Sequence, residues 1–260
     1  MGKILKYSFY DLIRSRWSYI YFMFYLLLGF VLFFLNNDVS KAVITLMNII
    51  IVLVPLIGTI FGVMYYYNSR EFTELLLAQP IKRSSIFLGQ YFGVASSLTL
   101  SLVLGLGIPF VLYGLFRSDA IFDFSLLLIT GAFLTLIFTA LSFNIALSNE
   151  NKIKGFGYAV LLWLFMAVIY DGLFLITLIL FEEYPLDTFS LVATMFNPID
   201  LSRTLILLKL DISALLGYTG AIFKQFFGTN TGFVISILML FLWTILPIWR
   251  LVYKAKRKDF

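Results

Sequence analysis

The chain alternates between long apolar runs and short polar segments. Six runs are each long enough to cross ~30 Å of hydrocarbon as a helix. They cover residues 17–35, 42–67, 86–116, 124–147, 156–181 and 231–249. Because a helix satisfies its own backbone polar groups inside a bilayer, the pattern predicts an all-α membrane protein with six transmembrane helices in one domain, residues 1–260.

The first run is preceded by an amphipathic segment, residues 3–16. Its apolar residues, such as Ile4 and Leu12, recur at helical spacing opposite Lys3 and Lys6. This pattern predicts an interfacial helix that lies on the membrane. A secretory signal peptide is the alternative, but the run that follows is longer than a typical signal-peptide core and no small-x-small cleavage motif follows it. We therefore expect the first span to be retained.

The composition limits the possible chemistry. Hydrophobic residues make up 61% of the chain and charged residues 13%, with a mean hydropathy of +0.98. Without any Cys or His, the chain lacks thiol nucleophiles, imidazole bases and the usual zinc ligands. It also has no Gly-x-x-x-x-Gly-Lys-[Ser/Thr] motif, so any ATP must be bound by another chain. We expect no enzyme activity, metal site or cofactor in this chain.

The positive charges are distributed unequally between the two sides of the predicted bundle. Of the 19 Lys and Arg residues, 14 fall on the side of the termini and 5 on the other side. The positive-inside rule therefore places both termini in the cytoplasm. We attribute the net charge of +5 to topology and to contact with anionic membrane lipids, not to nucleic-acid binding.

Small residues recur at every fourth position of the third run. They are Gly89, Gly93, Ser97, Ser101 and Gly105. Small residues allow helix backbones to approach closely inside a membrane, so this face is predicted to pack against another helix. The alternative is that Gly and Ser are simply common in membrane helices.

The polar segment at residues 68–85 is predicted to contain a short helix. Asn68 followed by Glu71 is typical of a helix start, and Glu71 and Glu74 suit the positive end of the helix dipole. Pro80 predicts that the helix ends at the residue before it. Ser84 is the expected cap of the next membrane helix.

This segment resembles the first cytoplasmic loop of ABC-2 type transporter permeases, in which an acidic turn leads into two Leu, a Pro and a basic residue. The matching positions are Glu71, Glu74, Leu75, Leu76, Pro80 and Arg83. The resemblance implies that the segment is a coupling helix seated on a separate cytoplasmic ATPase subunit, which carries ATP and Mg. An ordinary amphipathic connector is the alternative.

The fifth and sixth runs are joined by an external segment, residues 182–230. Asn197, Pro198 and Asp200 predict the start of an external helix near the membrane surface. The segment as a whole is expected to form external or re-entrant helices and to be the platform for an external partner protein. A later apolar and aromatic stretch is expected to dip into the outer leaflet or to pack against a partner. It contains Gly217, Tyr218, Gly220 and Phe223.

The external motifs narrow the resemblance. Tyr170-Asp171, Asn197-Pro198-Ile199-Asp200 and the stretch at 216–221 are similar to the NosY-type permeases, which serve the maturation of the copper sites of nitrous oxide reductase. The resemblance implies an ABC-2 (type V exporter-like) fold in a bacterial inner membrane, a homodimer, two ATPase subunits and a periplasmic or extracellular accessory protein. The alternative within the superfamily is an exporter of a lipid, peptide or drug.

Asp171 is the only ionisable residue well inside a predicted span. A carboxylate that faces lipid is costly, so we expect Asp171 to point into the bundle or a dimer interface and to pair with a polar group or water. Either a packing role or a gating or cargo role would fit this position. One carboxylate without His, Cys or a second acid is poorly suited to acid–base catalysis.

The Met residues are scattered without ligand spacing, so copper is expected on the partner proteins.

Overall fold

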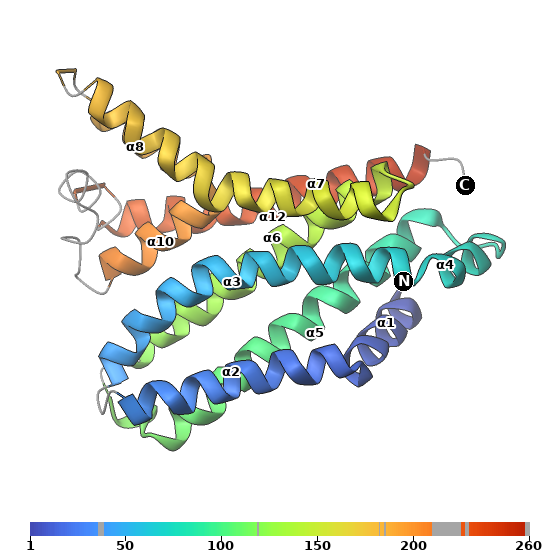
Figure 1. Cartoon of the computed structure of the whole chain (residues 1–260), viewed down its shortest axis with the longest axis horizontal. Helices are drawn as coiled ribbons and strands as arrows, with labels where there is room; N and C mark the ends of the chain where they lie inside the picture. Colours follow the sequence, from blue (N-terminus) through green and yellow to red (C-terminus); the bar gives the residue numbers. More distant parts are fainter. Residues whose placement is uncertain are drawn as a thin grey trace.

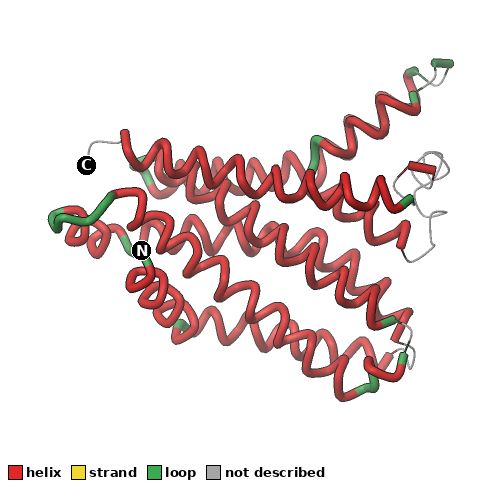
Figure 2. Tube along the Cα trace, turned by 180° about the vertical axis from the view of Figure 1, so that it is seen from behind, coloured by secondary structure: helices red, strands yellow, loops and turns green. Residues whose placement is uncertain are grey.

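The computed structural model describes residues 1–35, 39–118, 120–181, 183–184, 186–209, 225–226 and 229–257. All regular elements within these ranges are helical (Figures 1 and 2). Six helical segments are long and apolar enough to cross a membrane. The chain is therefore a multi-pass helical membrane protein.

The N-terminal segment forms two helices. Helix α1 (Gly2–Arg14) ends at Ser15, whose backbone is extended, and α2 (Arg16–Leu35) is the first span. The apolar face of α1 packs along the start of α5 and buries Ile4, Ser8 and Leu12. The predicted interfacial helix is thus anchored to the bundle on one side.

Three long helices form the centre of the bundle. They are α3 (Val39–Asn68), α5 (Arg83–Leu112) and α6 (Ile121–Ser148), and the contact between α3 and α6 is the most extensive of all helix pairs. Leu46, Ile50, Leu98 and Leu134 are fully buried between them. Helix α5 ends earlier than the predicted boundary of 116, because Gly114 adopts φ +88° and a short 3₁₀ turn, η1 (Leu115–Arg117), follows.

The fifth span consists of three consecutive elements. Helix α7 (Lys152–Leu164) runs into a π-helix, η2 (Phe165–Ile169), and then into α8 (Tyr170–Leu180). Helix α7 packs on α3 and α6, whereas α8 leans away from the other helices (Figure 1). The π-helix therefore marks the point where the span leaves the bundle.

Two shorter helices follow. Helices α9 (Asp187–Met195) and α10 (Pro198–Lys209) meet at an angle of 113°, as in a broken span or a re-entrant loop. The predicted surface position was wrong for α10, which packs between α3, α6 and α12, whereas the bend agrees with the alternative of re-entrant helices. The reason is that its apolar residues occupy most of its circumference, and Ile199, Leu201 and Ile206 are almost completely buried.

The last span, α12 (Asn230–Arg257), is longer than the predicted segment 231–249, because its helix continues through the basic residues that follow. Its C-terminal end lies at the same end of the bundle as α1 and the short helix α4 (Arg70–Leu77) (Figure 1). This arrangement agrees with an even number of crossings.

Candidate functional site

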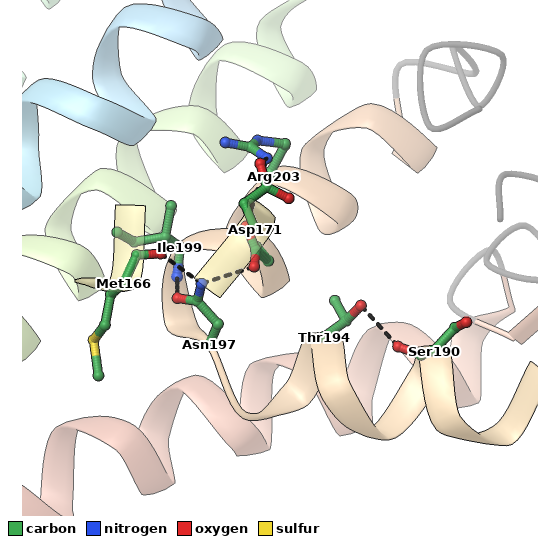
Figure 3. A network of polar contacts seen from close by, with 8 residues as sticks. Met166, Asp171, Ser190, Thr194, Asn197, Ile199 and Arg203 are labelled. Carbon is green, nitrogen blue, oxygen red and sulfur yellow. Dashed lines mark hydrogen bonds and ion pairs between the residues drawn. The ribbon is translucent and has the colours of Figure 1, made fainter. Parts of the chain in front are cut away.

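Two parts of the molecule carry the residues that the sequence singles out. The coupling segment (residues 68–85, which include α4) lies at the end of the bundle with the termini. The polar cluster (Asp171, Asn197, Asp200 and Arg203) lies around the bend between α9 and α10 (Figure 3). The structure keeps these two sites apart, so each is described by itself.

The start of α4 differs from the prediction. Asn68 is the last residue of α3, and its side-chain oxygen accepts a hydrogen bond from Lys152 Nζ at 3.0 Å. Ser69 stands at the N-cap of α4 without a capping side-chain bond. The predicted caps Asn68 and Ser84 were both wrong, since Ser84 lies inside α5, which begins at Arg83.

Helix α4 is firmly attached to the helices beneath it. The buried Thr73 Oγ1 accepts a hydrogen bond from Gln90 Nε2 of α5 at 2.8 Å, and Gln90 is itself fully buried. On α1, the ring of Tyr7 stacks on Phe72 with centroids 4.6 Å apart. These two contacts lock the short helix to α5 and α1.

The outer side of α4 faces water. Glu71 and Glu74 are exposed, and Glu74 Oε1 accepts from Arg70 Nε of the same helix at 3.0 Å. The Leu75 side chain is 68% exposed, Leu76 is half-buried, and Pro80 and Arg83 follow on the exposed surface. This surface combines acidic residues with an apolar side chain that nothing in the described chain covers.

In the polar cluster, Asn197 connects three backbone and side-chain groups. Its Oδ1 accepts from the backbone N–H of Ile199 at 3.1 Å and so caps α10, as its position before Pro198 predicts. Its Nδ2 donates to the carbonyl oxygen of Met166 and to Asp200 Oδ2, both at 2.7 Å (Figure 3). A single side chain thereby ties the π-helix η2 to the start of α10.

Arg203 lies one turn further along α10 and bridges two carboxylates. Its Nη1 donates to Asp171 Oδ2 at 3.0 Å and lies 3.5 Å from Asp200 Oδ1. The side chains of Arg203 and Asp171 are 27% and 34% exposed. The pair therefore lies at the edge of the bundle, partly open to its surroundings.

The bend between α9 and α10 reaches deep into the bundle. Trp243 Nε1 donates to the carbonyl oxygen of Met195 at 3.0 Å, and Trp243 is near the middle of α12. Met166, which binds Asn197, is near the middle of the span Lys152–Leu180. Two separate helices thus place the bend at mid-span. An unpaired charge near this depth would cost ~2.5–3.5 kcal/mol or more, which explains why the charges here are paired.

Arg203 is the residue of this cluster that the sequence analysis missed. It was counted among the external charges, because α10 was assigned to the outer surface. Its spacing of three residues from Asp200, the separation at which opposite charges pair on one helix face, is the signal that could have identified it.

The small residues of α5 face two different helices. A Cβ atom on Gly93 would lie 2.5 Å from Ser8 Cβ of α1, and one on Gly105 would lie 2.8 Å from Tyr25 Cβ of α2. Gly89 likewise lies against Ile4 of α1, and Ser97 and Ser101 are buried along the same helix. This face of α5 holds both N-terminal helices.

Several residues of the external segment lie outside the described residues. They are Glu182, Gly217, Tyr218, Gly220 and Phe223. Within the described ranges, no group of three or more His, Cys, Asp or Glu residues is placed to hold a metal ion.

No protein-family model and no curated protein matches this chain. The resemblance to ABC-2 permeases accordingly remains a prediction from the residues quoted above.

Proposed function

We propose that this chain is the membrane-spanning permease subunit of an ABC transporter complex. It acts as a homodimer with two copies of a separate cytoplasmic ATPase, which binds ATP and Mg. The observation that carries the proposal is α4, a short helix with an exposed acidic and apolar side that is locked to α5 from beneath. A helix that only connects two spans does not require a buried hydrogen bond such as that between Thr73 and Gln90.

The contacts of α4 suggest how motion would pass into the membrane. A displacement of α4 by the ATPase would move α5 through the buried Thr73–Gln90 hydrogen bond and α1 through the Tyr7–Phe72 stack. Helix α5 has 30 residues, about 45 Å at 1.5 Å per residue, so it spans the whole bilayer. Because α1 and α2 pack closely on its small residues, these three helices would move together.

The specific form that we propose is the permease of the complex that matures the copper sites of nitrous oxide reductase. It rests on the Asn197-Pro198-Ile199-Asp200 motif and its similarity to the NosY-type permeases. In this function the chain transmits motion, or carries a cargo other than the metal, to an external accessory protein. The copper itself would be held by partner proteins, since soft ligands with suitable spacing are lacking in this sequence.

The test is purification of the tagged full-length chain from its native host in a mild detergent. We expect an ATPase subunit with a phosphate-binding loop to copurify with the wild type, and the Glu71→Lys/Glu74→Lys variant to lose most of it, because reversed charges at an interface repel. The matched control is Glu183→Lys, the same charge reversal at an exposed position on the opposite end of the bundle.

Each outcome has a defined meaning. Normal ATPase recovery with the double variant would contradict the role of α4. Recovery of the ATPase without any external accessory protein would favour the alternative, an exporter of a lipid, peptide or drug, over copper-site maturation.

A further inference from the structure

A groove of about 810 Å³ lies along α12. Helix α6 contributes Leu141 to its wall, the bend between α9 and α10 contributes Met195 and Phe196, and α12 contributes the rest of the lining. Almost all of these side chains are apolar. The groove belongs neither to the coupling segment nor to the polar cluster.

The groove has the length of one leaflet of a membrane. Its inner end is at Met239, one turn before Trp243, which is near the middle of α12. Its other end is at Lys254, fifteen residues further along the same helix. This separation is about 22 Å at 1.5 Å per residue, close to half of the ~40–45 Å thickness of a bilayer that includes the headgroups.

The end of the groove that lies nearest the C-terminus carries two cations beside two aromatic rings. Arg250 and Lys254 line this end together with Trp249 and Tyr253. Within the described part of the chain, neither cation forms an ion pair with a carboxylate. Two cations without a nearby anion create a favourable position for a negatively charged group.

The orientation of Lys254 is set by α6. Its Nζ donates to the carbonyl oxygen of Asn144 at 3.4 Å and to the hydroxyl of Ser148. An ammonium group has three N–H donors, so one remains for an external oxygen acceptor. The ammonium is therefore held at the end of the groove with one donor available.

We propose that this groove binds one anionic phospholipid from the leaflet at the end of the bundle that carries both termini. An acyl chain lies against Leu242, Leu246 and Trp243, and the phosphate group contacts Arg250 and Lys254. The groove matches an acyl chain in length and polarity, and the cation pair selects the anionic headgroup. Aromatic side chains such as Trp249 and Tyr253 are typical of the headgroup level. This site does not depend on the proposed ATPase partner.

The proposal is tested by lipid retention. The detergent-purified chain is mixed with equal amounts of dioleoyl phosphatidylglycerol and dioleoyl phosphatidylcholine, separated by gel filtration, and its retained lipid is measured by mass spectrometry. The wild type should retain phosphatidylglycerol preferentially. Arg250→Gln/Lys254→Gln should reduce this preference about thirtyfold, since each of the two cations near an anionic headgroup contributes about 1 kcal/mol.

Two comparisons between variants distinguish binding in the groove from nonspecific attraction of anionic lipid to the positive charges of the protein. Lys154→Gln removes an exposed cation at the same end of the bundle, outside the groove, and should leave the preference unchanged. Leu242→Trp fills the groove and should lower retention of phosphatidylglycerol. Leu238→Trp, one turn away and also exposed, should not.

The proposal is overturned if the wild type retains both lipids equally, if Lys154→Gln reduces the preference as much as the double variant, or if the two Trp variants behave alike. The comparison of the two lipids on the wild type, and that of the two Trp variants, remain decisive should the double variant fail to fold.

Discussion

The third and fifth spans have nearly the same length and hydropathy, yet they are packed very differently. In the most apolar stretch of α5, 56% of the residues are buried, whereas in that of the span Lys152–Leu180 only 6% are buried. The mean hydropathy of this fifth span, 2.3, is nevertheless higher than the 2.0 of α5. In a bilayer, lipid is as apolar as a protein interior, so hydrophobicity alone does not bring helices together. What differs is how each span is attached.

Helix α5 is held by close packing, whereas the fifth span packs closely only through α7 and is also held by polar contacts. Helix α5 lies against α1 and α2 through its small residues. The fifth span is tied by Trp163 Nε1 to the carbonyl of Val52, by the Met166 carbonyl to Asn197, and by Asp171 to Arg203. We infer that α5 is held by close packing along its length, whereas the α8 part of the fifth span is held mainly by separate polar contacts.

The largest loss of stability is expected from a substitution that disturbs the packing of α5. In Gly93→Leu the new side chain would meet Ser8 Cβ and the backbone N of Phe9, so α1 must move away. We expect a loss of at least ~3 kcal/mol, the upper range for overpacked sites. The measurement is the melting temperature of the detergent-purified protein.

Gly107→Leu is the matched control on the same helix, since a Cβ atom there has no neighbour within 4 Å. We expect its melting temperature to remain near that of the wild type. Equal tolerance of both substitutions would show that α1 does not depend on this contact.

A smaller effect is expected from the polar cluster, and the two partners should differ. Arg203→Gln leaves Asp171 and Asp200 without their shared cation, whereas Asp171→Asn leaves Arg203 paired with Asp200. We expect Arg203→Gln to cost about 1–3 kcal/mol, less than for a fully buried pair because both side chains are partly exposed, and Asp171→Asn to cost less.

The same melting experiment compares the two variants, and an order opposite to the expected one would contradict the bridging role of Arg203. Activity measurements on Asp171→Asn add a second distinction. Preserved activity would indicate that Asp171 has a packing role, whereas lost activity in an assembled complex would indicate a gating or cargo role.

The six spans were predictable because each is a long and predominantly apolar run, a property of the local sequence. The small residues of α5 were also visible, since their spacing of four is a helical repeat. Which helices they face was not predictable, because Ser8 and Tyr25 lie far from them along the chain.

The fifth span and α10 show what the sequence could not reveal. No Pro or Gly marks the π-helix at Phe165–Ile169, whose position depends on contacts such as that of Met166 with Asn197. The start of α10 was evident from Asn197 and Pro198, but its depth was not, because an apolar helix near a membrane surface and one inside a bundle have similar residue patterns. The pairing of Asp171 with Arg203 depends on that depth.

The central claim is that α4 contacts the ATPase, and site-specific crosslinking tests it most directly. The chain has no Cys, so Leu75→Cys provides a single attachment point for a thiol-reactive photocrosslinker on α4. The Leu75 side chain is 68% exposed, and Leu112, at the opposite end of α5, is 69% exposed and provides the control, Leu112→Cys. We predict a crosslinked product of this chain with an ATPase subunit from position 75 and none from position 112. Absence of that product at position 75, or equal amounts from both positions, would contradict the account.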